Sequence, residues 1–162
     1  MGYHGVNVRS AVGGSGDAHP DSVAYNPHQL YGIAPEQVDA VWPKVAKWLD
    51  GSAESTRGKY TADDIKDGIL SGHAQLWLYD SPTAFGVLVT VIAEYPQNRC
   101  CVIKIGTGEN AEEWWDLALT RLEDFGRHAG CDAMEILCRP GWVKRFKSRG
   151  YDYTHAIMEK RL

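Results

Sequence analysis

The chain has 162 residues, of which 44% are hydrophobic and 23% are charged, and its formal net charge is −4. This length and apolar content suit one globular domain with a buried core, which excludes a disordered or fibrous protein. The small negative charge gives no reason to expect a nucleic acid or an anionic membrane as a partner. The four cysteines form no CxxC pair, so neither a zinc site nor a disulfide framework is expected.

Residues 1–32 differ in composition from the rest of the chain. They are rich in Gly, Ser, Asn and His, and we predict that they form an extended N-terminal arm ahead of a folded domain at residues 33–162. Ordering such a segment costs conformational entropy that its own composition cannot offset. We therefore expect the domain surface or a partner protein to hold the arm, which is a first indication of an assembly component.

The folded part is expected to begin with two helices. Apolar residues recur at three- and four-residue spacing over residues 35–51, and Pro43 is expected to kink this helix. Thr61 and Asp64 have the spacing of a capping pair, which predicts the start of a second, shorter helix that ends near Gly72.

Three strands joined by tight turns should follow. Residues 73–79 alternate between apolar and polar or wider side chains, which is typical of a half-buried strand. Residues 80–83 predict a hairpin turn. Residues 84–95 form a nearly continuous apolar run and therefore predict a central strand. A third strand is expected at residues 100–105, before a glycine-containing break.

The second half alternates helices and strands. The clearest helix covers residues 111–128, and a buried strand is expected at residues 131–138. A short basic helix at residues 142–149 and an alternating final strand at residues 151–162 complete the chain. A strand–helix–strand unit joined to an antiparallel meander predicts an α/β domain, with a central mixed sheet and helices on both faces.

This order of elements from Pro35 to Leu162 resembles the GNAT superfamily of N-acetyltransferases. The resemblance is strongest in CRPGWVKRFKSRGYD, residues 138–152, where a strand end, a short basic helix, a glycine and an aromatic residue follow one another. Gly150 and Tyr151 match the Gly-Phe element that these proteins carry after the short helix. The resemblance implies a GNAT-like fold and, for an active member, acetyl-coenzyme A as the cofactor.

The short helix departs from the family pattern at three positions. Arg139, Trp142 and Phe146 stand where GNAT proteins commonly carry Asn, Ala and Tyr. In the family that phenol is often the acid that reprotonates the coenzyme A thiolate. Phe146 cannot donate a proton, so the resemblance implies weakened catalysis here.

A second departure concerns the turn that binds the cofactor pyrophosphate in the family, usually an Arg or Gln followed by spaced glycines. The nearest match is residues 105–111, where Gly106 and Gly108 keep the glycine rhythm but Ile105 replaces the basic or amide residue. Carboxylates at the helix start stabilise its dipole, yet they also repel a pyrophosphate. These carboxylates are Glu109, Glu112, Glu113 and Asp116.

The first of two hypotheses is a GNAT-like domain with degraded motifs that serves as a structural or assembly protein. The ending at residues 142–162 is loosely similar to that of GNAT-like virion-associated proteins of tailed phages. This hypothesis expects no cofactor and a location in a virion or the host cytoplasm, without secretion or a membrane. Protein partners, including further copies in a homo-oligomer or virion, would bind through residues 1–32 and the basic C-terminal face. This face comprises Arg139, Lys144, Arg145, Lys147, Arg149, Lys160 and Arg161.

The second hypothesis is an acetyl-coenzyme A dependent N-acetyltransferase with an atypical active site. Glu94, late in the long strand, or His155, on the final strand, would act as the base for the acceptor amine. The cofactor would be held by Gly106, Thr107, Gly108 and Asn110. No HxH or HxxxH pair occurs, so no metal ligands are proposed. The residues leave both hypotheses open.

Overall fold

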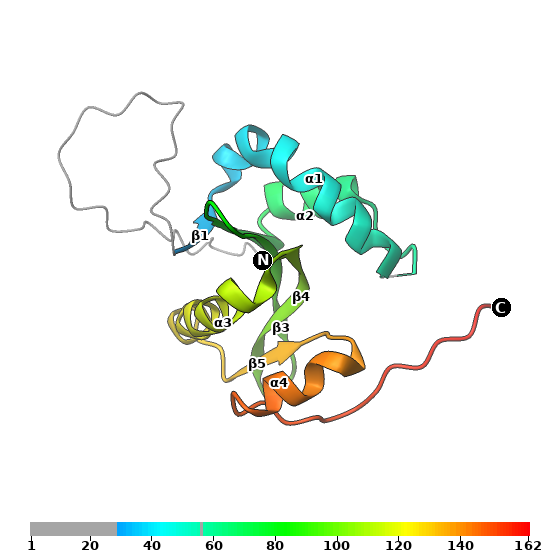
Figure 1. Ribbon diagram of the computed structural model, residues 1–162. Coiled ribbons are helices and arrows are strands. Elements are labelled where there is room, and N and C mark those ends of the chain that lie inside the picture. Colours follow the sequence, from blue (N-terminus) through cyan, green and yellow to red (C-terminus); the bar gives the residue numbers. More distant parts are fainter. Residues whose placement is uncertain (1–28, 56) are drawn as a thin grey trace.

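The structure, a computed structural model, describes residues 29–55 and 57–162 (Figure 1). A five-stranded sheet lies at its centre in the order β1-β2-β3-β4-β5. Neighbouring strands are antiparallel except β4 and β5, which are parallel. The strands are β1 Leu30–Ile33, β2 Ala74–Asp80, β3 Phe85–Glu94, β4 Arg99–Glu109 and β5 Ala133–Ile136. The helices are α1 Val38–Ser55, α2 Ala62–Leu70, α3 Ala111–His128 and α4 Val143–Lys147, with 3-10 turns η1 Pro35–Gln37 and η2 Pro140–Trp142.

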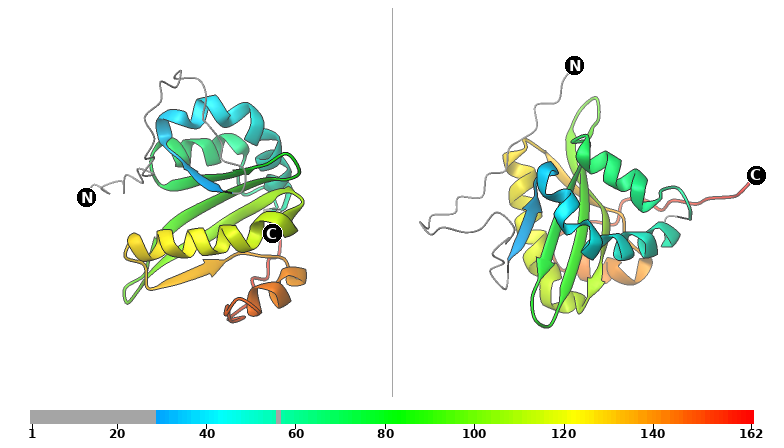
Figure 2. Two further views of the ribbon diagram at one scale, coloured as in Figure 1. Left: turned by 60° about the vertical axis from the view of Figure 1, so that its left-hand side comes forward. Right: turned by 90° about the horizontal axis from the view of Figure 1, so that it is seen from above.

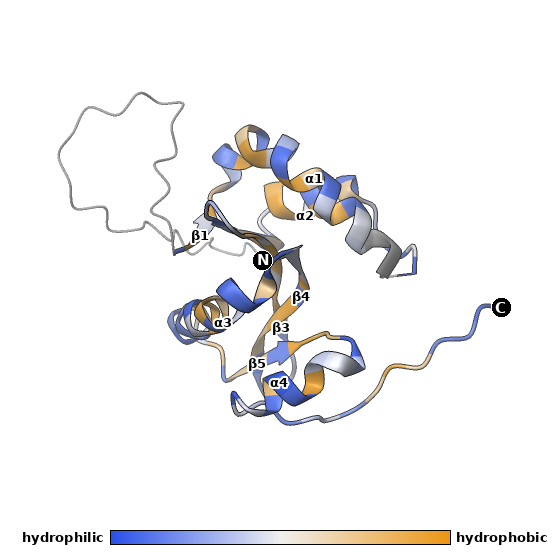
Figure 3. Cartoon of the chain, viewed as in Figure 1, coloured by the Kyte–Doolittle hydropathy of each residue, from blue (hydrophilic) through white to orange (hydrophobic). Residues whose placement is uncertain are grey.

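Helices cover both faces of this sheet (Figure 2). One core lies between the sheet and the pair α1 and α2, and includes Val45, Leu49 and Ile69. The other lies between the sheet and α3, and includes Trp77 and Leu122. The apolar sides of the helices face the sheet (Figure 3). The predicted α/β architecture with a mixed sheet and helices on both faces is confirmed.

The two N-terminal helices form largely as predicted. The Thr61 backbone N–H donates to Asp64 Oδ2 at 2.8 Å, and the Asp64 N–H donates to Thr61 Oγ1 at 3.1 Å. The hydrogen bonds from Thr61 hold the pKa of Asp64 below its usual value. The predicted end of α1 at Gly51 is wrong, because the helix continues through Pro43 and Gly51 to Ser55. Its buried face also continues, since Ser52 is buried and bonds to the Trp48 carbonyl.

The folded domain begins earlier than the predicted boundary between residues 32 and 33. Leu30 to Ile33 pair with β2 as an edge strand, so residues 30–32 belong to the sheet. Four residues with a central glycine are too short to show a period. Gly32 lies against the Trp77 ring, and an added Cβ would come within 3.1 Å of it. The remainder of the predicted arm, residues 1–28, lies outside the described residues.

The predicted final strand at residues 151–162 is wrong. This segment has no secondary structure, and every residue from Asp152 onward is exposed. It passes the connection between α1 and α2, where Glu159 forms ion pairs with Arg57 at 3.2 Å and with Lys59 at 2.6 Å. Alternation of side chains alone does not make a strand, because the backbone needs a neighbouring strand for its hydrogen bonds. In the part of the chain that the structure describes, no helix is both long and apolar enough to cross a membrane.

Candidate functional site

The candidate site begins where β4 and β5 separate. These strands pair only from Cys100 to Ile103, and the last bond joins the Leu137 N–H to the Ile103 carbonyl at 3.1 Å. β4 then continues to Glu109, and within the described part of the chain β3 is its one strand partner there. A register shift leaves Lys104 as an additional residue opposite β3, which is the geometry of a β-bulge. A bulge bends its strand, so β4 turns away from β5 at this point.

Aromatic side chains fill the space beside the separated half of β4. Trp115 of α3, Trp142 of η2 and Phe146 of α4 form what we term the aromatic cluster. Ring centroids lie 5.7 Å apart for Trp115 and Trp142, 5.4 Å for Trp115 and Phe146, and 6.0 Å for Trp142 and Phe146. Trp115 is 5% exposed and Phe146 is 4% exposed. The cluster therefore joins β4, α3 and α4 into one packed unit.

The two glycines expected to bind a cofactor have packing roles in this structure. A Cβ on Gly106 would lie 2.5 Å from the Trp115 ring. A Cβ on Gly108 would lie 2.0 Å from the Phe85 carbonyl oxygen, and its φ of +147° disfavours other residues. The predicted break at residues 106–108 is wrong, because these residues pair with β3.

The connection from β4 to α3 is a single residue, Asn110. It adopts a left-handed conformation with φ 48°, and its side chain donates to the Thr83 carbonyl. α3 then begins at Ala111. A pyrophosphate site of the expected kind needs a loop whose successive backbone N–H groups converge on the anion. A paired strand followed by one connecting residue, Asn110, differs from a loop of this kind.

The first turn of α3 already has partners for its carboxylates. Glu113 accepts hydrogen bonds from Tyr79 Oη at 2.9 Å, Ser81 Oγ at 2.8 Å and Thr83 Oγ1 at 2.7 Å. Burial, and then the bond to Glu113, raise the pKa of Tyr79. Glu112 forms an ion pair with Arg145 of α4. The carboxylates in the first turn of α3 therefore connect this helix to the β2–β3 turn, through Glu113, and to α4, through Glu112.

These contacts predict unequal effects for two neighbouring glutamates. Replacing Glu113 with Ala removes the acceptor of three hydroxyl groups, one of them on the buried Tyr79, and should lower the free energy of unfolding by about 1.5–3 kcal/mol. Glu112→Ala is the matched control, since it loses the same dipole interaction but only an exposed ion pair, which contributes about 0–1 kcal/mol. Urea unfolding of both variants measures the difference. Equal losses would contradict the role given to Glu113.

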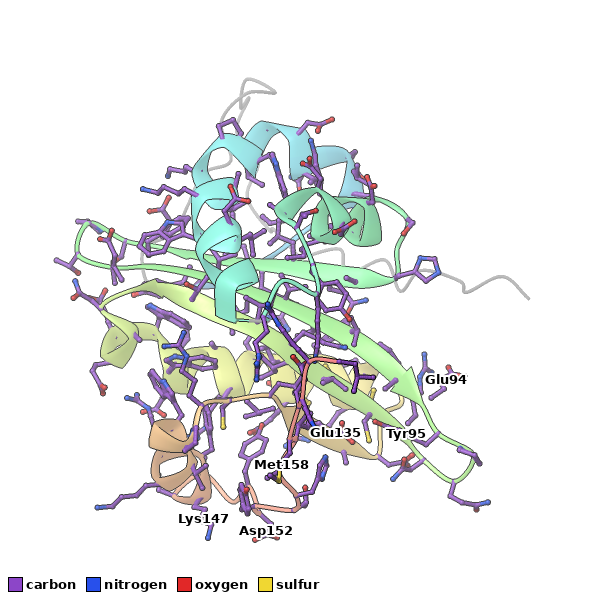
Figure 4. The ribbon with its side chains drawn as sticks, turned by 90° about the vertical axis from the view of Figure 1, so that its right-hand side faces the viewer. Glu94, Tyr95, Glu135, Lys147, Asp152 and Met158 are labelled. Carbon is purple, nitrogen blue, oxygen red and sulfur yellow. The ribbon has the colours of Figure 1, made fainter. Side chains whose placement is uncertain are left out.

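The two expected base residues lie away from the glycines expected to bind the cofactor. Glu94 is exposed at the end of β3, where its Oε1 lies 3.5 Å from Arg99 Nε. Figure 4 labels it at the tip of the hairpin. Gly108 lies at the opposite end of β4, roughly 30 Å along the strand. His155 is exposed in the C-terminal segment, and Thr154 before it lines a crevice beside Met134, also toward the hairpin end of the sheet.

The side chains at and near position 146, where GNAT proteins commonly carry the acidic Tyr, are poor proton donors. Phe146 occupies that position and is buried in the aromatic cluster. Tyr151 beside it donates its hydroxyl to Glu123 Oε1 at 3.1 Å, and burial followed by the Glu123 charge raises its pKa. Cys138, expected to be buried, is exposed, and partial desolvation raises its pKa. Residues 29–55 and 57–162 contain no group of three or more His, Cys, Asp or Glu side chains that could hold a metal ion.

The fold matches solved acetyltransferase structures. An aminoglycoside acetyltransferase from an uncultured soil metagenomic sample, in complex with sisomicin, has a TM-score of 0.58 and 9% identity, over 83% of this chain and 95% of that one. A predicted acetyltransferase from Clostridium acetobutylicum with acetyl-coenzyme A has a TM-score of 0.55 and 10% identity, over 82% and 95%. A transcriptional regulator from Bacillus halodurans C-125 has a TM-score of 0.61 and 11% identity, over 83% and 99%.

No protein-family model matches the sequence, and no curated protein matches it either. The structural likenesses show that the domain has the GNAT-type acetyltransferase fold. At these sequence identities they show the fold alone.

Proposed function

We propose that this chain is a non-catalytic GNAT-like domain that acts as a structural or assembly protein and does not use acetyl-coenzyme A. The packing of the aromatic cluster beside β4 carries this proposal. Trp115 covers Gly106, and Trp142 and Phe146 extend that packing to α4. Side chains of the chain itself therefore occupy the space beside β4 where the cofactor arm would have to lie.

The electrostatics at the start of α3 support the same proposal. Arg145, which could attract a phosphate, forms ion pairs with Glu112 and with Asp116, the latter at 3.7 Å. Glu113 adds a further negative charge that is bound to the β2–β3 turn. A diphosphate would have to displace Arg145 from two carboxylates and then lie beside them.

The proposed partners are proteins. Arg139, Lys144 and Lys147 are exposed along η2 and α4, and they suit carboxylates on a partner surface. Residues 1–32 would provide a second contact, and most of them lie outside the described residues. The C-terminal sequence is loosely similar to that of GNAT-like tailed-phage proteins. On this basis we place the proposed partners in a virion assembly, which can include further copies of this chain.

Titration calorimetry with acetyl-coenzyme A tests the absence of a cofactor site. We expect no binding tighter than a Kd of about 1 mM for the full chain, because the aromatic cluster and the carboxylates of α3 exclude the ligand. Inorganic pyrophosphate is the matched control ligand, since it reports any weak attraction of anions to the basic face. A micromolar Kd for acetyl-coenzyme A that pyrophosphate at the same concentration does not reproduce would overturn the proposal.

A second candidate is an acetyl-coenzyme A dependent N-acetyltransferase. It is supported by the bulge and by the separation of β4 from β5, because among the described residues one edge of β4 has no strand partner after Ile103. In that case Glu94 or His155 would deprotonate the acceptor amine. Release of coenzyme A in the presence of amines, lost in Glu94→Gln or His155→Ala, would favour this candidate over the first.

A further inference from the structure

Three cations along η2 and α4 have no ion-pair partner in the described part of the chain. Arg139 precedes η2, Lys144 and Lys147 belong to α4, and all three side chains are exposed. The sequence around them, RPGWVKRFKSR at residues 139–149, contains no acidic residue. Figure 4 labels Lys147 at the outer side of α4, away from the sheet. We term Arg139, Lys144 and Lys147 the α4 basic surface.

An open pocket of about 510 Å³ adjoins the α4 basic surface. It is lined by Glu112, Gly141, Trp142, Lys144, Arg145 and Ser148. Among these residues the one carboxylate, Glu112, already forms an ion pair with Arg145. Trp142 is only partly buried, so the pocket combines an aromatic surface with the unpaired charge of Lys144. This combination suits a partner that carries an apolar side chain next to carboxylates.

α2 carries a surface with the complementary properties. Asp63, Asp67 and Leu70 are spaced by four and then three residues, so they lie on one face of this helix. All three are exposed, Leu70 to 43%. Within the described residues, neither aspartate has an ion-pair partner. We term Asp63, Asp67 and Leu70 the α2 acidic surface.

The two surfaces do not meet within one chain. Figures 1 and 2 show α2 and α4 on opposite sides of the sheet. In agreement with this placement, Ile69 of α2 and Phe146 of α4 belong to the two different cores. A contact between the surfaces therefore needs a second copy of the chain, and every copy offers one surface of each kind.

We propose that the α2 acidic surface of one copy of this chain binds the α4 basic surface of the next copy. The two aspartates would pair with Lys144 and Lys147. Leu70 would contact Trp142 in the pocket, since a helix that docks through residues at i, i+4 and i+7 is a recurring mode of recognition. Because two different surfaces meet, the contact is heterologous and repeats from copy to copy in a ring or a filament. This inference rests on the proposed assembly function and names its partner.

Sedimentation velocity on the full chain tests this proposal. We expect self-association that increases with protein concentration in about 0.01 M salt and weakens strongly in about 1 M salt, where charges are screened beyond roughly 3 Å. Lys144→Ala with Lys147→Ala is the basic-surface variant, and Asp63→Ala with Asp67→Ala is the acidic-surface variant. Each should weaken self-association at least about tenfold. Both should stay folded, because alanine suits a helix and these four side chains have no ion-pair partner among the described residues.

A mixture of the two variants distinguishes a heterologous contact from other kinds of self-association. Each variant keeps one intact surface, so neither should associate alone. An equimolar mixture should form a dimer with one copy of each variant, and this dimer should grow no further. Lys160→Ala with Arg161→Ala is the matched control, because it removes the same charge outside the α4 basic surface and should leave self-association unchanged.

Three results would overturn the proposal. They are a chain that stays monomeric in about 0.01 M salt up to a concentration of about 1 mM, self-association that both variants retain, and a mixture that forms no dimer. Their meaning differs from that of the calorimetric test. Micromolar binding of acetyl-coenzyme A would reject the non-catalytic assignment, whereas a failure to self-associate would reject only the partner named here.

Discussion

Gly108→Ala is expected to lower the free energy of unfolding by about 3 kcal/mol or more, in the absence of any ligand. The new Cβ would lie 2.0 Å from the Phe85 carbonyl oxygen and 2.9 Å from the Gly86 Cα. Both are backbone atoms, so the two central strands would have to move apart. The φ of +147° adds backbone strain for any residue other than glycine. Thermal or urea unfolding of the purified variant measures the loss.

Gly141→Ala and Gly51→Ala are the matched controls for this change. Nothing lies within 4 Å of a Cβ at either position. Gly51 is inside α1, so its replacement should stabilise the protein by about 0.5–1 kcal/mol. If Gly108 belonged instead to a flexible loop that binds phosphate, Gly108→Ala would resemble these controls in stability. That outcome would contradict the strand pairing on which the proposed function depends.

Trp115→Ala should destabilise the domain by about 3–5 kcal/mol, the usual cost of removing a buried large aromatic side chain. Trp115 packs against Trp114, Trp142 and Phe146 and covers Gly106. Its loss would leave a cavity that borders β4, α3 and α4 at once. Trp142→Ala is the matched control from the same cluster, and it should cost less because Trp142 is only partly buried.

A double-mutant cycle tests whether the Trp115 ring is the reason that only glycine fits at position 106. Gly106→Ala alone should be clearly destabilising, since its Cβ would meet the indole at 2.5 Å. In the Trp115→Ala background the same methyl group enters empty space, so it should be neutral or stabilising. If the losses of unfolding free energy are additive, the Trp115 ring does not explain the glycine at position 106. That result would support a ligand-binding role for Gly106 beside β4.

Local sequence patterns were sufficient for most of the helices and strands. The bounds of α3 match the predicted residues 111–128, because its apolar face repeats over several turns and its ends carry clear signals. The Thr61 and Asp64 pair was recognisable from spacing alone, because both hydrogen bonds of a capping box are local. The predicted strand order of a meander followed by a strand–helix–strand unit also agrees with the sheet.

The predictions that proved wrong depend on contacts between distant residues. β1 is too short to show a pattern, and it is a strand because β2 lies beside it. Residues 151–162 show the opposite case, an alternating pattern without a partner strand among the described residues. Pairing with a distant strand decides both cases, and a window along the sequence does not contain it.

The sequence by itself determined the layered α/β domain, since periods of two and of three to four residues record which side of each element is buried. It also showed that Phe146 has no proton to donate. Only the tertiary structure showed what Gly106 and Gly108 pack against. A glycine serves equally to expose backbone N–H groups to an anion or to make room for an indole ring. Whether Trp115 or a pyrophosphate lies above it depends on how α3 packs on β4, which no local pattern specifies.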